Sequence, residues 1–232
     1  MMSTFHLFAF GIYPYIALAV MFIGTWIRYD REQYTWKASS SQLLEKKWLR
    51  IGSIPFHIGI IGIFFGHLVG LLTPVEVWHL LGVSASAKQI LAVVAGGLFG
   101  VLCLFGLVVL TLRRLFHPRI RPNSKPMDIV VLFLLLAQLL LGLASIFISV
   151  GHLDGAVMLQ LMHWAQSVFL LRGLSGAEYI VGVHWIFKAH LVLGLTIFLL
   201  FPFTRLVHLL SVPVKYLGRN YQVVRRRARA SM

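Results

Sequence analysis

The chain has 232 residues, of which 59% are apolar and only 12% are charged, with a mean hydropathy of +0.84. A soluble domain needs roughly a quarter of its residues charged to cover its surface, so the composition excludes an ordinary soluble protein and indicates a polytopic membrane protein. The net charge of +14 does not indicate nucleic-acid binding, because apolar runs separate the basic residues into clusters. The single cysteine, Cys103, excludes disulfide scaffolds, iron–sulfur clusters, cysteine-based zinc sites and covalently attached c-type haem within this chain.

Five apolar stretches are long enough to cross a bilayer as helices. A span needs about 20 mostly apolar residues, and the stretches that qualify are 7–27, 53–73, 89–112, 128–149 and 184–209. The first lacks a basic start and a small-x-small cleavage site, so we interpret it as a retained helix and not as a signal peptide. The expected fold class is therefore all-α, a polytopic bundle with five transmembrane helices.

The basic residues predict how these spans are oriented. Seventeen of the 21 Lys and Arg residues lie in the connection after the first span, the connection after the third span and the C-terminal tail. Since Lys and Arg accumulate on the cytoplasmic side, we expect the N-terminus outside and the C-terminus in the cytoplasm. The connection 150–183 could carry a short helix on the outer face. The basic tail, 210–232, either anchors on anionic lipid or docks a cytoplasmic partner.

Four histidines lie within the spans, where ionisable residues are costly and usually mark function. His57 and His67 lie in the second span, and His190 and His208 lie in the fifth. Because these two helices are antiparallel, only one pairing by depth is available: His57 with His208 on the cytoplasmic side, and His67 with His190 on the outer side. Neutral imidazole is a good ligand for haem iron. The two pairs therefore predict two bis-histidine b-type haems in series across the bilayer.

The spacing along the two helices fits this pairing only in part. The rise from His57 to His67 is about 15 Å, and the rise from His190 to His208 is about 27 Å. Eighteen residues make five full turns, so a continuous fifth helix would place both of its rings on one face. The difference of about 12 Å requires helix tilt, and Pro202 could kink the fifth helix between its two histidines.

Glycines recur along the second span beside its histidines, at Gly59, Gly62, Gly66 and Gly70. They could form a flat strip against which a porphyrin face lies. The other interpretation, which the glycines alone favour at least as much, is that small residues allow close helix packing.

Motifs spread over nearly the whole chain are similar to those of one membrane cytochrome family. They are Ile12-Tyr13-Pro14-Tyr15-Ile16, Arg28-Tyr29-Asp30, Gln33-Tyr34-Thr35-Trp36, Phe56-His57-Ile58-Gly59, Gly66-His67, His190-Leu191-Val192-Leu193-Gly194, Leu200-Phe201-Pro202-Phe203 and Arg205-Leu206-Val207-His208. These segments resemble the gamma subunit of respiratory nitrate reductase, a dihaem cytochrome b that anchors a cytoplasmic molybdenum and iron–sulfur catalytic pair. The segments around the haem ligands are specific, whereas the apolar ones are not.

The resemblance implies the same pairing of histidines as the depth comparison. His57 and His208 match the ligands of the haem nearer the cytoplasmic partners, and His67 and His190 match the ligands of the distal haem. The family also implies a redox loop, in which quinol is oxidised near the distal haem on the outer side. The electrons then pass through both haems to an iron–sulfur beta subunit and a molybdenum alpha subunit, where nitrate is reduced.

The quinol site is expected around the outer start of the third span. The family places a lysine there, which matches Lys88, and an ammonium group could hydrogen-bond a quinone oxygen. Gly66, beside His67, would leave room for the quinol ring. The plainer interpretation of Lys88 is a helix-end lysine that extends its charge toward water.

Three arginines are candidate partners for the anionic propionates of the proximal haem. Arg205 lies three residues before His208, and Arg113 and Arg114 lie at the cytoplasmic end of the third span. Topology signalling by basic residues would explain all three without any haem.

Two alternatives remain open from the sequence. One is a dihaem cytochrome b subunit of a sulfite-, heterodisulfide- or formate-type complex. The other belongs to a different class, a haem-free transporter that uses its buried histidines as a proton relay.

Overall fold

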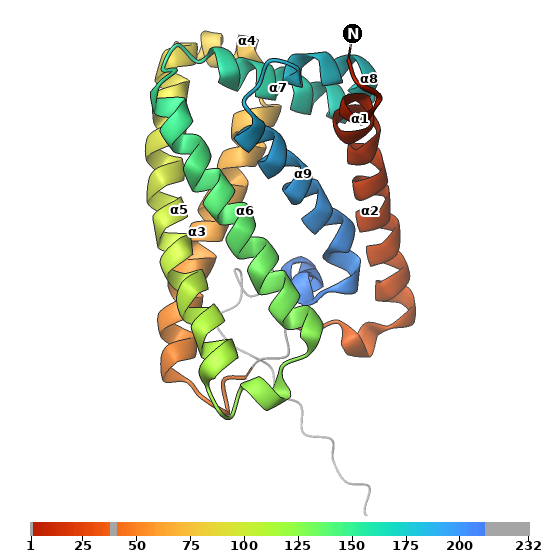
Figure 1. The fold of residues 1–232 in the computed structure, drawn as a ribbon, viewed down its shortest axis with the longest axis vertical. Coiled ribbons are helices and arrows are strands. Elements are labelled where there is room, and N and C mark those ends of the chain that lie inside the picture. Colours follow the sequence, from red (N-terminus) through yellow and green to blue (C-terminus); the bar gives the residue numbers. More distant parts are fainter. Residues whose placement is uncertain (1, 38–40, 212–232) are drawn as a thin grey trace, which may run out of the picture.

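The computed structural model describes residues 2–37 and 41–211, and over these residues the chain is a bundle of helices (Figure 1). Within them, five helices are long and apolar enough to cross a membrane: Thr4–Arg31, Lys47–Leu72, Ala85–Phe116, Pro126–Val150 and Trp185–Phe203. The all-α class and the five predicted spans are confirmed. The orientation stays a prediction, and nearly all of the basic tail lies outside the described residues.

The long helices are joined by short helical segments. The first span combines α1 (Thr4–Leu7), η1 (Phe8–Ile12) and α2 (Tyr13–Arg31), and the next three are α3 (Lys47–Leu72), α5 (Ala85–Phe116) and α6 (Pro126–Val150). The fifth span is α9 (Trp185–Leu200) with η5 (Phe201–Phe203). The connecting segments are η2 (Gln33–Thr35), α4 (Val75–Leu80), η3 (Arg121–Asn123), α7 (Ala156–Phe169), α8 (Gly173–Gly176), η4 (Ala177–Ile180) and η6 (Arg205–Ser211).

The long helices pack in a row that differs from their order in the chain. Helix α3 packs along α5, α5 along α6, α6 along α9, and α9 along α2. In Figure 1, α4, α7 and α8 lie at the upper end of the bundle, and η2 and the connection 117–125 lie at the lower end.

The contact between α3 and α5 divides the glycine strip into two halves. A Cβ atom on Gly59 would lie 2.6 Å from the backbone nitrogen of Cys103, and one on Gly62 would lie 2.5 Å from the ring of Phe99. These two glycines therefore permit close helix packing. Gly66 and Gly70 differ, because a Cβ on either would meet nothing within 4 Å. Only the upper half of the strip faces open space.

An apolar core lies toward the upper end of the described chain. Residues of η1, α2, α7, η4 and α9 form it, including Phe10, Trp164 and Phe187. The π-helical turn η1 is tied to α7, because the Trp164 indole N–H donates to the carbonyl of Phe10 at 2.9 Å. The expectation of a short helix within 150–183 is confirmed, and this connection is part of the core.

The fifth helix does not continue to residue 209, so that prediction is wrong. Helix α9 ends at Leu200, and Thr204 has extended backbone angles (φ −118°, ψ 176°) before η6 begins. Pro202 lacks a backbone N–H and cannot continue the helical hydrogen bonds. Arg28 of α2 stabilises the break by donating to the carbonyls of Pro202 and Thr204, at 2.6 and 2.7 Å. His208 therefore lies in a separate segment, and the estimate of five turns between the two histidines does not apply.

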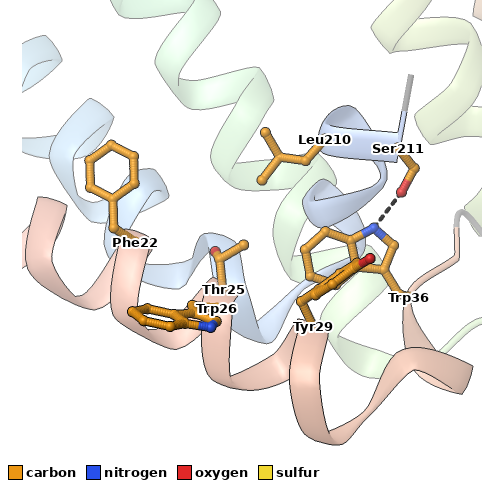
Figure 2. Close-up of a pocket in the computed structure, with 7 residues that line it drawn as sticks. All are labelled: Phe22, Thr25, Trp26, Tyr29, Trp36, Leu210 and Ser211. Atoms are coloured by element: carbon orange, nitrogen blue, oxygen red, sulfur yellow. Dashed lines mark hydrogen bonds between the residues drawn. The ribbon is translucent and has the colours of Figure 1, made fainter. Parts of the chain in front are cut away.

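The segment η6 is also held against the lower end of α2. Side chains from α2, the end of η2 and η6 surround a groove of about 560 Å³ (Figure 2). They are Phe22, Thr25, Trp26, Tyr29, Trp36, Leu210 and Ser211. The indole N–H of Trp36 donates to the hydroxyl of Ser211. This bond fixes the position of the chain three residues after His208.

Gly59→Ala should destabilise the bundle, because the added methyl group meets the backbone of α5 and rigid overpacking costs about 1–3 kcal/mol. We expect a lower apparent Tm for the detergent-solubilised protein by thermal denaturation. Gly97→Ala is the matched control, since a Cβ there has nothing within 4 Å. Equal Tm values for the two variants would contradict the packing role of Gly59.

Candidate functional site

His67 of α3 and His190 of α9 face each other across the bundle. Their ring centres are 6.1 Å apart, and the ring planes differ by 36°. Helices α3 and α9 run antiparallel, so residues 123 positions apart meet near the upper end. The structure thus brings together the pair that the depth comparison predicted for the outer side.

All four histidines of the predicted pairs are held in the same way. In each, the ring Nδ1 lies within hydrogen-bond distance of a backbone carbonyl oxygen, which can only accept a hydrogen bond. Nδ1 therefore carries the proton, and Nε2 keeps the lone pair that a metal ligand needs. The carbonyls belong to Ser53 for His57 (2.7 Å), Ile63 for His67 (2.9 Å), Gln138 for His190 (3.1 Å) and Arg205 for His208 (2.5 Å).

This orientation is not shared by every histidine of the chain. The Nδ1 atoms of His117 and His184 accept hydrogen bonds from backbone N–H groups. His152 also donates to a carbonyl, but it lies just beyond the upper end of α6 and not within a span. The carbonyl contact by itself only orients a histidine ring. The His67–His190 site differs from the other histidines because two rings oriented in this way approach each other.

The spacing of this pair fits a metal that is held between two imidazoles. Two metal–nitrogen bonds of about 2 Å, with each ring centre about 1 Å beyond its nitrogen, require about 6 Å between ring centres. The observed 6.1 Å agrees with that requirement. Two imidazoles are also what a bis-histidine haem would take from its protein, because haem iron accepts neutral imidazole as a ligand. The residues present therefore fit a bis-histidine haem.

Polar and small residues of α6 and α9 shape the site around His190. The amide nitrogen of Gln138 lies 3.3 Å from His190 Nε2. A Cβ on Gly142 would lie 3.0 Å from the His190 ring, and one on Gly194 would lie 3.1 Å from the Gln138 amide. Sequence reasoning missed Gln138, although a polar amide within a span is a recognisable signal.

The second predicted pair is less complete in the structure. His57 lies in the lower half of α3, and His208 lies in η6 at the lower end. Over the part of the chain that is described, no ring contact joins these two histidines. Their pairing stays a prediction.

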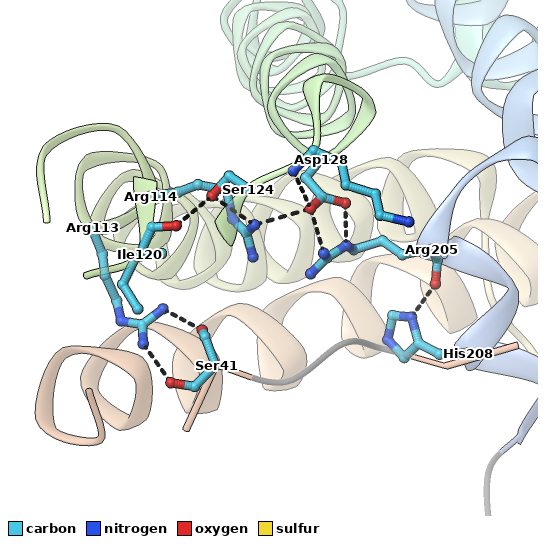
Figure 3. A network of polar contacts seen from close by, with 9 residues as sticks. Ser41, Arg113, Arg114, Ile120, Ser124, Asp128, Arg205 and His208 are labelled. Atoms are coloured by element: carbon cyan, nitrogen blue, oxygen red, sulfur yellow. Dashed lines mark hydrogen bonds and ion pairs between the residues drawn. The ribbon is translucent and has the colours of Figure 1, made fainter. Parts of the chain in front are cut away.

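A buried carboxylate organises the lower end near His208. Figure 3 shows Arg114 and Arg205 approaching Asp128 from opposite sides. Arg205 makes a two-point contact with Asp128, through Nε at 2.8 Å and Nη2 at 2.6 Å, and Arg114 Nη1 lies 3.1 Å away. Because His208 donates to the carbonyl of Arg205, Asp128 also fixes the segment that carries this histidine.

Arg113 lies in a neighbouring ion pair that holds the connection before α3. Its guanidinium donates to the Glu45 carboxylate at 2.7 Å and to the Ser41 hydroxyl at 2.9 Å. Burial raises the pKa of the Glu45 carboxyl, but the hydrogen bonds from Arg113 and from two backbone N–H groups outweigh burial and lower this pKa below its ordinary value. All three arginines that were predicted to bind propionates thus have partners within the protein, and Arg205 keeps the most exposed side chain of the three.

Lys88 is buried at the upper end, one turn into α5. Its ammonium donates to the carbonyl of Gly70 at 2.7 Å, and Gly70 lies three residues after His67 on α3. Helix α3 therefore carries His67, the carbonyl that Lys88 contacts, and the open space beside Gly66 and Gly70. Lys88, Gly66 and His67, the three residues predicted around a quinol, belong to one region of the structure.

Comparison with known proteins identifies the family. The family model described as nitrate reductase gamma subunit matches residues 6–227. The chain belongs to this family. It is 52% identical over 229 residues to the respiratory nitrate reductase 1 gamma chain of Escherichia coli (strain K12), which covers 97% of this chain and 100% of the relative. It is also 42% identical over 218 residues to the nitrate reductase gamma chain of Bacillus subtilis (strain 168), covering 94% and 97%.

The predicted resemblance is therefore confirmed, and the chain is a membrane subunit of respiratory nitrate reductase. A gamma subunit is one part of a larger enzyme, so this chain works within a multi-subunit complex. The match favours a nitrate reductase over the sulfite-, heterodisulfide- or formate-type complexes that the sequence left open.

Asp128→Asn should destabilise the lower end of the gamma subunit, because it leaves two partly buried arginines without their carboxylate. Breaking a fully buried ion pair costs about 3–5 kcal/mol, and the partial exposure of both arginines makes the cost smaller here. We expect a lower apparent Tm and faster proteolysis within residues 205–211. Asp30→Asn, at an exposed carboxylate, is the control. A parental Tm for Asp128→Asn would show that the arginines do not depend on Asp128.

Proposed function

We propose that this gamma subunit oxidises membrane quinol and holds two b-type haems, through which electrons reach an iron–sulfur beta subunit and a molybdenum alpha subunit. The observation that carries the proposal is the approach of His67 and His190, which lie on two antiparallel helices. Their ring centres are 6.1 Å apart, and the Nδ1 atom of each ring contacts a backbone carbonyl. Family membership supports it, since the relatives are gamma chains of nitrate reductases.

His67 and His190 would hold the haem near the upper end, and His57 and His208 would hold the haem near the lower end. Haem iron, when bound, supplies one-electron chemistry. The protein supplies neutral imidazoles with a fixed tautomer, because each Nδ1–H is held by a carbonyl. Arg205 is the best placed of the three arginines to reach a propionate near His208, since its side chain is 23% exposed whereas that of Arg113 is 3% exposed.

Lys88 would bind the quinol next to the Gly66–Gly70 face of α3. Oxidation of a quinol to a quinone releases two electrons and two protons, and each oxygen becomes more negative as it loses its proton. A fixed ammonium stabilises that developing charge in a low-dielectric site. Gly66 and Gly70, which lack side chains, leave the space in which the ring can approach His67.

The predicted orientation would make the reaction electrogenic. With the N-terminus outside, protons leave at the upper end, and electrons are delivered at the lower end to the partner subunits. Moving one charge across the membrane is worth about 2.3 kcal/mol per 100 mV. The basic tail, 210–232, is proposed to dock those partners, although all but its first two residues lie outside the described chain.

Histidine substitutions test the haem ligands in membranes that contain the whole complex. We expect two low-spin b-haem signals in an optical and EPR redox titration. His67→Ala or His190→Ala should remove one signal, and His57→Ala or His208→Ala should remove the other. His152→Ala, which removes a ring with the same carbonyl contact, should keep both. Colourless protein would instead support a haem-free transporter.

Lys88→Ala tests the quinol contact. Loss of a charge-assisted hydrogen bond should lower quinol-dependent haem reduction by about tenfold or more, while dithionite still reduces the full haem content. Lys188→Ala is the control, because Lys188 lies on α9, whereas Lys88 lies on α5, and its ammonium donates to the carbonyl of Val181. Unchanged quinol-dependent reduction in Lys88→Ala would exclude the role proposed for Lys88.

A further inference from the structure

Lys88 is a buried cation without a carboxylate partner. Its side chain belongs to a residue that is 5% exposed, and the ion pairs of the described chain all involve arginines of the lower end. Its ammonium instead contacts the Gly70 carbonyl at 2.7 Å and the Met162 sulfur at 2.8 Å. Burying an ammonium is costly unless other groups stabilise its charge, so the remaining neighbours of Lys88 must contribute.

Trp78 supplies the missing stabilisation through the face of its indole ring. The ammonium nitrogen of Lys88 lies 4.6 Å from the centre of that ring. A cation within about 6 Å of the centre of a tryptophan ring is attracted by the negative face of the ring, and the attraction is strongest where water is excluded. The Trp78 indole N–H is buried and has no hydrogen-bond partner among the described residues. The contribution of Trp78 to this contact is therefore its ring face.

The absence of a carboxylate next to Lys88 has a chemical consequence. A carboxylate would neutralise the ammonium and compete with any ligand that carries negative charge. A ring face stabilises the cation without neutralising it. The third neighbour, the thioether of the fully buried Met162, is a weak hydrogen-bond acceptor, so the ammonium gains a stronger acceptor when a ligand oxygen replaces the sulfur. The cage of Gly70, Trp78 and Met162 keeps a positive charge available to an incoming oxygen.

We propose that Trp78 is a positioning residue for quinol oxidation: its ring holds the charged Lys88 ammonium beside Gly70, and the quinol oxygen takes the place of the Met162 sulfur. This inference rests on the proposed function of Lys88 as the quinol contact. It adds Trp78 as the residue that keeps the ammonium of Lys88 charged and in place. Helix α4, which carries Trp78, connects α3 to α5 at the upper end and so belongs to the quinol site.

The test separates the ring face from the N–H group and from structural effects. Trp78→Phe keeps an aromatic face and removes the N–H, whereas Trp78→Leu removes both. In membranes containing the whole complex, with menadiol and decylubiquinol as reductants, Trp78→Leu should raise the KM for quinol about tenfold. Trp78→Phe should stay within about threefold of the parent, since a phenyl ring retains part of the attraction. Haem content and the optical spectrum should be unchanged in both variants.

A double-mutant cycle tests whether Trp78 acts through Lys88. In the Lys88→Ala background, Trp78→Leu should cause no further loss, because the charge that the ring stabilises is absent. If Trp78→Leu prevents assembly, Trp78→Met provides the non-aromatic comparison. Equal KM values for Trp78→Leu and the parent, a Phe variant as poor as the Leu variant, or additive effects in the double variant would each overturn the inference.

The outcomes also separate this inference from the proposed function. If Lys88→Ala lowers quinol oxidation while Trp78→Leu does not, Lys88 contacts the quinol but Trp78 does not position it. If Lys88→Ala itself has no effect, both the quinol role of Lys88 and the role of Trp78 are wrong. Met162→Leu should keep or lower the KM, because leucine cannot compete with the quinol oxygen for the ammonium, and a raised KM would contradict the proposed displacement.

Discussion

Hydrocarbon offers no hydrogen-bond partner to an imidazole N–H or a free backbone carbonyl, and this constraint governs how the functional histidines are held. Each of the four donates its Nδ1–H to a carbonyl, from its own helical segment or, for His190, from α6. The same constraint explains Arg28. Where Pro202 interrupts the last span, carbonyl groups lose their helical partners, and Arg28 of α2 satisfies two of them. The interruption needed to place His208 is thus stabilised by the first span.

In the described chain, the arginines of the lower end and the lysine of the upper end have different partners. Arg113, Arg114 and Arg205 pair with Glu45 or Asp128 at the lower end, and these pairs hold the connections and η6 in place. Lys88 at the upper end contacts a carbonyl, a thioether and an indole ring. A carboxylate partner neutralises part of the charge of a cation, and Lys88 has no such partner among the described residues. The upper end therefore carries a cation that its neighbours do not neutralise. The arginines of the lower end anchor the chain and, on our proposal, Arg205 also reaches a haem propionate.

Much of the fold followed from local properties of the chain. Apolar length predicted the five spans, and antiparallel geometry predicted that His67 and His190 share a depth. The fifth helix was extended too far, because the path of the chain after Pro202 depends on contacts with Gly24 and Arg28, which lie far away in the sequence. The glycines of α3 show the same limit: Gly59 and Gly66 have the same residue type and lie on the same helix, yet one packs on α5 and the other faces open space.

The amino-acid sequence was enough to predict the five apolar helices and the shared depth of His67 and His190, because hydropathy and helical rise depend on consecutive residues. It was also enough to indicate the family, through motifs that keep their order along the chain. Packing in three dimensions was required for the surroundings of Lys88. Gly70, Trp78 and Met162 come from three separate helices, and no spacing rule relates α7 to α3 or α5. Such contacts form only when the helices assemble, and they decide whether a buried charge is neutralised or left available.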